Sequence, residues 1–477
     1  MLCLYTKFYQ NTQQYTRNNN DFLKTLFVFY HLTPFVLPLP NMDEKLWDVA
    51  VIGGGPAGMM AAARAAEKLG AEGKVILIEK NATLGKKLLI TGGGRCNVTN
   101  AEFDNRKLLE KFKDDGKFLF SAFAQWSVKE TLDFFHGKKM ETKVEAGQRV
   151  FPASNKAQSV WNVMVEYVKA GGVEVLSNSQ VADILIETKA DSTSSPQVAG
   201  VILKNKKIIR AKSVVIATGG TSRPETGSTG DAYKWLRKIG HEVVEPEPSL
   251  VPLTVKDEWV KKLAGVSLTG VKLTVFQNGV KQNVGPKKSP RVKLGASKIL
   301  FTHVGLSGPT ILNMSKDIGE LLKYGEVVLS LDLLPQMDYS VLNSKLQEIF
   351  KINDKKKFKN SLSPLVPSAL VSAVVELSGV NPDTACNSVT REERLNLVKV
   401  LKNIPINVSG LLGADKAIIT SGGVALSEVD FKTMRSRLFP NLYLVGDILN
   451  IDRPSGGYSL QLCWTTGYVA GSNAVKP

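Results

Sequence analysis

The chain has 477 residues, of which 43% are hydrophobic and 22% are charged, and 40 of them are glycine. This globular composition is long enough for two or three domains and excludes a disordered or fibrous chain. The 61 lysine and arginine residues outnumber 44 acidic residues, so the formal net charge of +17 favours anionic partners such as nucleotide phosphates, RNA or a membrane surface.

The first 47 residues differ from the rest of the chain. A polar stretch of 20 residues precedes an apolar one that contains Lys24, His31 and three prolines. A membrane span needs about 20 apolar residues without such breaks. We therefore expect residues 1–47 to form a disordered or weakly packed extension, with Met42 as a candidate natural start. A targeting peptide is the alternative, although Arg17 is the only arginine in the segment.

A strand, a glycine-rich turn, a helix and a second strand are predicted from Asp48 onward. The stretch DVAVIGGGPAGMMAAARAAEKLG contains Gly53, Gly55 and Gly58 in the spacing GxGxxG, and the next strand, KVILIEK, contains Glu79 near its end. This order is typical of a dinucleotide-binding βαβ unit, in which the helix N-terminus faces the pyrophosphate and the acid binds the ribose. A glycine-rich packing turn is the alternative. The ribose acid favours FAD or NAD over NADP.

Residues 84–100, LGKKLLITGGGRCNVTN, follow the second strand at the edge of the sheet where ligands bind. Gly92, Gly93 and Gly94 would let the backbone run against a bound dinucleotide, because they carry no side chain. Arg95 and Lys86 or Lys87 would then be available to its phosphates or to an anionic flavin. A surface glycine loop with solvated lysines is the alternative.

Two later segments favour FAD over NAD. Residues 207–230 place a buried strand before Ala217-Thr218-Gly219-Gly220, and residues 441–474 give a strand, Gly446-Asp447, a glycine pair and a helix. FAD lies stretched across its domain, so the late acid can bind its ribityl or pyrophosphate end, while the N-terminus of the last helix points at the N1/O2 edge of the flavin. An amphipathic C-terminal helix with a glycine cap is the alternative.

The stretches TGGGRCNVTN, VFPASNKAQSV, ATGG with TGSTGDAY, FTHVGLSGP, TSGGVALSEV and GDILN with GGYSLQ occur in this order. Together they resemble the BaiN/YhiN-like FAD-dependent oxidoreductases, also described as aminoacetone-oxidase-like flavoproteins, over about Asp48 to Ala474. The resemblance implies a glutathione-reductase-type FAD domain with an insertion that has a β-barrel-like part and a helical part. Asp447 stands where many relatives carry Glu, and Ser459 where they carry Asn.

The periodicity of the residues agrees with an insertion. Between His241 and about Ile404 the βα rhythm gives way to alternating strands and then to helical patterns. We therefore predict an α/β fold with a discontinuous, Rossmann-like FAD-binding domain over 48–240 and 405–477, an inserted β-rich domain over 241–335 and an inserted helical domain over 336–404. A second GxGxxG is missing from the sequence, so NAD(P)H would have to visit the flavin directly as a transient electron donor.

Several side chains are predicted to take part in the site. His303, one of four histidines, could pass protons to a substrate, and Arg149 could bind an anionic substrate; the alternatives are a satisfied structural histidine and a surface ion pair. The predicted cofactor-binding residues are Gly53, Gly55, Gly58, Glu79, Lys80, Lys86, Gly93, Arg95, Cys96, Asn97, Val181, Gly219, Gly446, Asp447, Gly457, Tyr458, Ser459 and Leu460.

The four cysteines, Cys3, Cys96, Cys386 and Cys463, lie far apart and without metal-ligand spacing. This pattern predicts free thiols in a reducing, cytoplasmic compartment and no metal site. Basic runs at 204–212, 281–298 and 354–360 invite an RNA-binding reading, but they lack interleaved aromatic residues, so solvated faces are favoured. We expect a small-molecule substrate, no stable nucleic acid partner and no membrane span.

Three functions remain open from the sequence alone. The first is an FAD-dependent oxidoreductase that transfers hydride between a small or medium organic substrate and flavin N5. The second is a flavin-dependent RNA-modifying enzyme, whose retention on RNA would fall steeply with salt. The third is a flavin-binding protein without turnover.

Overall fold

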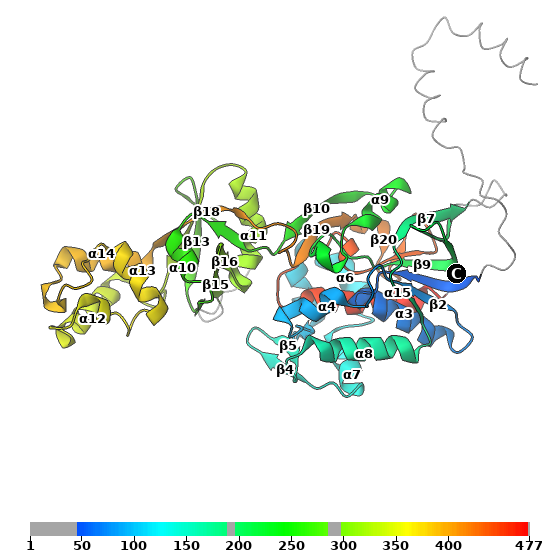
Figure 1. Cartoon of the computed structure of the whole chain (residues 1–477), viewed down its shortest axis with the longest axis horizontal. Helices are drawn as coiled ribbons and strands as arrows, with labels where there is room; N and C mark the ends of the chain where they lie inside the picture. The colour runs from blue at the N-terminus through cyan, green and yellow to red at the C-terminus, as the bar shows by residue number, and fades with distance from the viewer. Residues whose placement is uncertain (1–44, 188–195, 285–296, 476–477) are drawn as a thin grey trace, which may run out of the picture. The chain divides into compact units, whose positions relative to one another are not determined.

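A computed structural model describes residues 45–187, 196–284 and 297–475 (Figure 1). The predicted extension therefore lies outside the described residues except for 45–47, and so does most of the basic run at 281–298. Residues from Leu46 onward belong to one compact unit. Among the described residues, no helix is both long enough and apolar enough to cross a lipid bilayer.

A parallel sheet forms the centre of the first part of the fold. Its strand order is β22-β9-β1-β2-β6, and each neighbouring pair is parallel. Val49, Ala50 and Val51 of the central strand are fully buried, because helices cover both faces of such a sheet. The predicted α/β fold is confirmed. The strands are β1 Trp47–Ile52, β2 Val75–Ile78, β6 Glu174–Leu176, β9 Ile208–Ile216 and β22 Leu442–Leu444.

Antiparallel strands extend this sheet at two places. The hairpin of β7 Val181–Glu187 and β8 Gln197–Leu203 pairs with β9, and β20 Val429–Asp430 and β21 Arg435–Ser436 continue the sheet beyond β22.

Two helices from opposite ends of the described chain pack against each other. Helix α3 Pro56–Leu69 follows β1, and α15 Tyr458–Asn473 lies beside it (Figure 1). A side chain at Gly467 of α15 would meet the Ala57 carbonyl oxygen at 2.5 Å, and one at Gly471 would meet that of Ala61 at 2.4 Å. The small residues of both helices therefore allow a close approach of the two backbones, which brings the C-terminal segment to the start of α3.

Shorter elements surround this core. A small antiparallel sheet has the order β3-β5-β4. The bounds are β3 Thr99–Asn100, β4 Thr142–Glu145, β5 Arg149–Pro152, α4 Lys86–Ile90, α5 Asn105–Leu109, α6 Gly116–Phe123, α7 Val128–Gly137, α8 Ala157–Ala170 and α9 Asp231–Lys238.

The second part of the fold is an eight-stranded antiparallel sheet with helices packed on it. Its strand order is β12-β15-β16-β11-β18-β17-β13-β14, which gives the β-rich and helical insertion that was predicted. The bounds are β11 Leu253–Val255, β12 Ser267–Thr269, β13 Lys272–Gln277, β14 Val280–Gln282, β15 Lys298–Thr302, β16 Gly305–Ser307, β17 Val327–Asp332, β18 Ile404–Leu411, α10 Glu258–Lys262, α11 Pro309–Leu322, α12 Tyr339–Ile352, α13 Ser368–Ser378 and α14 Arg391–Lys402.

The connections between the two parts run through a separate strand pair. Strand β10 Val243–Ser249 pairs with β19 Ile419–Val424, and β18 still belongs to the inserted sheet as far as Leu411. We therefore propose that the ends of the insertion lie close to 250 and 412. The finer division into domains at 241, 335 and 404 stays a prediction.

Candidate functional site

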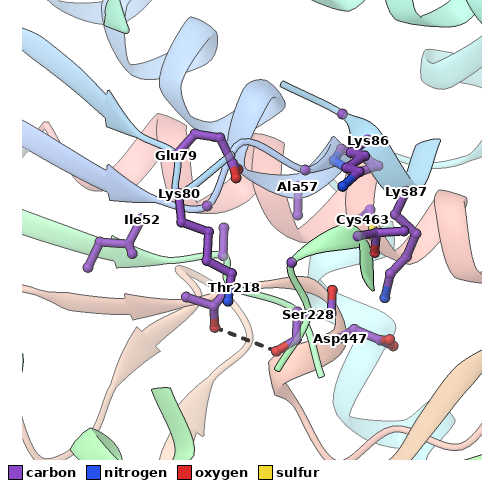
Figure 2. A pocket seen from close by; sticks show the side chains of 18 of the residues that line it. Ile52, Ala57, Glu79, Lys80, Lys86, Lys87, Thr218, Ser228, Asp447 and Cys463 are labelled. Carbon is purple, nitrogen blue, oxygen red and sulfur yellow. Dashed lines mark hydrogen bonds between the residues drawn. The ribbon is translucent and has the colours of Figure 1, made fainter. Parts of the chain in front are cut away.

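A pocket lies where the carboxyl ends of β1, β2 and β9 meet the start of α15. Figure 2 shows Glu79 and Lys80 at one side of it and Lys87, Asp447 and Cys463 at another. Segments from residues 52–57, 78–91, 179–181, 217–231 and 418–463 contribute to its wall. This is the edge of a parallel sheet at which open α/β folds bind their ligands.

In the glycine turn between β1 and α3, two glycines are required by packing within the protein and a third faces open space. Gly53 has φ +100°, and a side chain there would meet the Ala217 carbonyl oxygen at 2.5 Å; at Gly58 it would meet the Gly53 carbonyl oxygen at 1.9 Å. At Gly55 a side chain would meet no protein atom within 4 Å. The fold therefore requires glycine at positions 53 and 58, whereas the space beside Gly55 is open toward the pocket.

The start of α3 is suited to an anion. Gly55 is the residue before the first helical turn, it provides no side-chain cap, and Pro56 begins the helix. No acidic residue occupies the first turn, so its backbone N–H groups point their positive end at the pocket without a competing carboxylate. Together with the open space at Gly55, this arrangement fits the pyrophosphate of a dinucleotide.

Glu79 is fixed at the end of β2. Its Oε2 accepts a hydrogen bond from the Gly54 backbone at 2.7 Å, and its Oε1 accepts from the backbone and side chain of Asn81, both at 2.7 Å. The residue is 7% exposed and lines the pocket. A carboxylate held in this way is suited to the ribose hydroxyls predicted for it. Its neighbour Lys80 donates to Thr229 at 2.6 Å and to Asp231 at 3.0 Å.

Arg453 organises the wall formed by the C-terminal segment. Its guanidinium bonds to the Asp447 carboxylate, donates from Nε to Ser459 Oγ at 3.0 Å and donates from Nη1 to the Ile451 carbonyl at 2.7 Å. Arg453 is only 5% exposed, and the side chains of Arg453, Asp447 and Ser459 line the pocket. The interpretation of the sequence singled out Asp447 and Ser459 but missed Arg453. The signal available for it was an arginine between Gly446-Asp447 and the glycine pair.

The loop that carries Arg453 is held from two other elements. The Asp452 backbone donates to Asp115 Oδ2 at 3.0 Å, and Lys316 Nζ of α11 donates to Asp452 Oδ2 at 2.6 Å. Asn313 of α11 accepts from the Ser455 backbone at 2.9 Å. Burial raises the pKa of Asp115 above its ordinary value. The position of Arg453 therefore depends on contacts from the inserted region as well as from the first part of the fold.

Two neighbouring lysines of α4 differ in how far they are buried. Lys87 is partly buried, lines the pocket and donates to Ser222 Oγ at 3.1 Å. Burial lowers the pKa of Lys87, and the nearby Asp447 carboxylate opposes this effect. Lys86 is exposed and donates to the Glu225 carbonyl at 2.9 Å.

The three glycines of TGGGRCN adopt the left-handed conformation that glycine favours. The φ angles of Gly92, Gly93 and Gly94 are +58°, +68° and +82°. Side chains at Gly93 and Gly94 would meet no protein atom within 4 Å, so the backbone conformation alone accounts for these residues. Thr91 lines the pocket, whereas the glycines do not. Their close approach to a cofactor stays a prediction.

The three residues after these glycines lie outside the pocket wall. Arg95 pairs with Glu145, donates to Asn155 at 2.6 Å and lies over the Phe151 ring at 4.2 Å. Cys96 is fully buried, and burial raises the pKa of its thiol to about 12. The Oδ1 atom of Asn97 is buried and has no hydrogen-bond partner in the described part of the chain, which leaves it available to a ligand.

The other predicted residues divide into two groups. Ten of the predicted cofactor residues line the pocket: Gly53, Gly55, Glu79, Lys80, Lys86, Val181, Gly219, Asp447, Ser459 and Leu460. Gly58, Gly93, Arg95, Cys96, Asn97, Gly446, Gly457 and Tyr458 lie outside its wall. Gly457 has φ +102° and would clash at 2.3 Å with the Thr99 backbone if it carried a side chain, so packing requires it.

The two candidate catalytic residues lie elsewhere. His303 is exposed in the turn between β15 and β16. Arg149 Nε donates to the Ala146 carbonyl at 2.9 Å, and its guanidinium lies 5.9 Å from the centre of the Phe151 ring. Neither residue lines the pocket, and their catalytic roles stay predictions.

The glycine turn on α3, the acid after β2 and the return of a C-terminal helix to the same pocket define an FAD-dependent oxidoreductase of the Rossmann class. The chain belongs to the HI0933-like family, whose Rossmann domain matches residues 47–473. This membership confirms the resemblance predicted from the sequence motifs. No cluster of three or more potential metal ligands occurs within the described ranges.

Two relatives match almost over their full length. The chain is 28% identical to the 3-dehydro-bile acid delta(4,6)-reductase of Clostridium scindens, over 90% of this chain and 99% of the relative. It is also 28% identical to the ribosomal RNA dihydrouridine synthase of Escherichia coli, over 90% of this chain and 98% of the relative. The crystal structure of 3-ketosteroid delta1-dehydrogenase from Sterolibacterium denitrificans shares the fold, with a TM-score of 0.50 and 13% identity over 90% of this chain and 99% of that one.

The open space at Gly55 gives a direct test of the dinucleotide site. We expect Gly55→Val to fold normally but to bind FAD about 10- to 100-fold more weakly, because overpacking against a ligand costs about 1–3 kcal/mol. Isothermal titration of the cofactor-free protein with FAD measures the affinity, and circular dichroism checks the fold. Gly137→Val is the matched control, since a side chain there also meets open space, outside the pocket. Unchanged FAD affinity in Gly55→Val would contradict the assignment of this turn.

The residues after the glycine run give a second test. We expect Cys96→Ser to keep FAD and most of its flavin reduction rate, because a thiol with a pKa of about 12 does not supply a thiolate near neutral pH. We expect Arg95→Ala to weaken FAD binding or slow reduction, because it removes the contacts with Glu145 and Asn155 that hold the residues directly after the glycine run. Stopped-flow reduction by NADPH measures both variants. A Cys96→Ser protein that binds FAD but does not turn over, beside a fully active Arg95→Ala protein, would reverse the two roles.

Proposed function

We propose that this protein reduces a carbon–carbon double bond that is conjugated to a carbonyl group, with FAD as its cofactor. The observation that carries the proposal is that two full-length relatives, each 28% identical, bear the names of a delta(4,6)-reductase and a dihydrouridine synthase. In a 3-dehydro bile acid the 4,6 double bonds are conjugated to the 3-ketone, and in uridine the C5–C6 double bond is conjugated to the C4 carbonyl. Both substrates contain a carbon–carbon double bond conjugated to a carbonyl group, although their ring systems differ.

The residues of the pocket support the cofactor half of this proposal. Glu79 would bind the ribose hydroxyls, and the open backbone at Gly55 with the α3 N-terminus would bind the pyrophosphate. Asp447, held by Arg453, and Ser459 would face the flavin end. FAD, when bound, supplies hydride transfer at its N5 atom. The pocket would hold the cofactor extended between Glu79 and the start of α15.

A reduced nicotinamide is the electron donor that we propose. The sequence has one GxGxxG turn, and FAD would take the pocket beside it. A nicotinamide would therefore bind transiently against the flavin and leave before the substrate enters. Such an exchange predicts that the donor and the organic substrate compete for one place, which gives ping-pong kinetics.

The leading substrate is a small or medium organic molecule with a conjugated enone. Uridine within RNA is the second candidate, for two reasons that stand on different observations. The chain carries a formal net charge of +17, which attracts an RNA backbone, and a relative of the same similarity is named for ribosomal RNA.

Both candidates are tested by one experiment on the purified holoenzyme. FAD is first reduced anaerobically with NADPH or NADH, and the reduced protein is then mixed with a 3-keto-4,6-diene steroid or with an unmodified ribosomal RNA transcript. We expect reoxidation of the flavin, followed by absorbance, with a product that has gained two hydrogens by mass spectrometry. The matched control is the saturated 3-ketosteroid, which has the same ring system but no double bond to reduce.

The outcomes separate the two candidates and the proposal as a whole. Reoxidation by the diene alone identifies a small-molecule reductase, whereas reoxidation by RNA that falls steeply with added salt identifies an RNA-modifying enzyme. A protein that is reoxidised equally by the saturated ketosteroid, or by neither conjugated substrate, would contradict reduction of a conjugated double bond.

A further inference from the structure

One face of the small sheet β3-β5-β4 gathers cations outside the cofactor pocket. The register of the two longer strands places Lys143 opposite Phe151 and Glu145 opposite Arg149, so these four side chains share a face. Arg95 joins them, because its guanidinium pairs with Glu145 and lies 4.2 Å from the centre of the Phe151 ring. None of these five described residues lines the pocket. We call this set the hairpin face.

Glu145 is the only acidic residue within the strands β3, β4 and β5. Arg95 pairs with its carboxylate, and Lys143 Nζ lies 3.6 Å from its Oε1 atom. The hydrogen bond from Arg95, together with the charges of Arg95, Lys143 and Arg149, holds the pKa of Glu145 below its ordinary value. The acidic residues next in sequence lie beyond the strand ends and make no ion pair with these cations: Glu141 and Glu102.

Arg149 is the cation of the hairpin face that has no ion-pair partner within the described part of the chain. Its Nε donates to the Ala146 carbonyl at 2.9 Å, and its guanidinium lies 5.9 Å from the centre of the Phe151 ring. Its two terminal nitrogens donate to no acceptor among the described residues. A planar guanidinium with free N–H groups can bind both oxygens of a carboxylate or a phosphate.

The hairpin face borders two segments that contribute to the pocket wall. Asn100 of β3 pairs with Arg149, and its Nδ2 donates to the Gly456 carbonyl at 3.1 Å, two residues before α15 begins. A side chain at Gly92, which directly follows a residue of the pocket wall, would meet the Phe151 ring at 3.4 Å. The hairpin face therefore lies beside the start of α15, the end of the pocket at which we propose that the flavin binds.

We infer that Arg149, with Arg95 and Lys143 beside it, binds an anionic group of the substrate, a carboxylate or a phosphate, while the conjugated double bond lies at the flavin. The inference rests on the proposed function and adds that the substrate is an acid. The side chains of Arg95 and Lys143 are 37% and 40% exposed, so an anion can reach them from solvent. Because the hairpin face lies outside the pocket wall, it would stay available when FAD is bound.

The test uses the FAD-loaded protein, reduced anaerobically with NADPH or NADH. It is mixed with a 3-keto-4,6-diene steroid that has a side-chain carboxylate, and with the methyl ester of that steroid, which keeps the double bonds but has no charge. We expect Arg149→Met, which is uncharged, to raise the KM for the acid relative to that for the ester by about tenfold, because only the acid loses a charge-assisted hydrogen bond.

An unmodified ribosomal RNA transcript tests phosphate as the source of the anion. If phosphate is the group that Arg149 binds, Arg149→Met raises the KM for the transcript by about tenfold and leaves the ratio of acid to ester unchanged.

Two further variants make the comparison specific. Arg149→Lys keeps the charge and should restore part of the preference for the anion. Arg237→Met removes an arginine that pairs with Glu245 outside the pocket, and it should change neither the ratio nor the KM for RNA. If Arg149→Met does not fold, Arg149→Gln decides the question by the same measurements. Isothermal titration of the cofactor-free variants should show the native affinity for FAD.

The outcomes distinguish this inference from the proposal on which it rests. An unchanged ratio of acid to ester would overturn the inference if the KM for RNA is also unchanged, or if it rises equally in Arg149→Met and Arg237→Met. A loss of FAD affinity in Arg149→Met would also overturn it, since Arg149 would then bind the cofactor. A native reduced protein that neither the steroids nor RNA reoxidise would instead contradict the proposed function itself.

Discussion

The site depends on how closely the start of α3 approaches the sheet. The Gly53 backbone lies against Ala217 at the end of β9, and the Gly58 position lies against the Gly53 carbonyl, so neither residue can carry a side chain. This approach sets the N-terminus of α3 at the carboxyl edge of β1. The alanine face of α3 then accepts α15 at Gly467, which returns the C-terminal segment to the same edge. One steric constraint thus assembles both walls of the pocket.

The sign of the charge on the pocket wall changes along the length of the pocket. At one side a carboxylate, Glu79, is held by backbone N–H groups and suits neutral hydroxyls. In the middle, an uncapped helix N-terminus suits a pyrophosphate. At the other side Lys87 and Arg453 line the pocket together with Asp447, and Arg453 pairs with that carboxylate. The order of acid, dipole and cations supports the proposed binding of an extended dinucleotide.

The sequence could predict the parts of the site that depend on local pattern. The GxGxxG turn, Glu79 and Asp447 each follow a strand, and strand ends share one edge of a parallel sheet. Arg453 does not directly follow a strand, and its role comes from its contact with Asp447 and from its place on a loop that Lys316 of the insertion holds. Periodicity likewise located the insertion but not its ends, because β18 resembles any alternating strand until its pairing is known.

The central claim, that this pocket is built for the full length of FAD, is tested most directly by titrating the cofactor-free protein with FAD and with FMN. Glu79 and the α3 N-terminus would bind the adenosine and pyrophosphate parts, which FMN lacks in whole or in part. We predict that FAD binds at least about 100-fold more tightly than FMN, which corresponds to about 2.8 kcal/mol of binding free energy. Equal affinity for the two flavins would contradict the account.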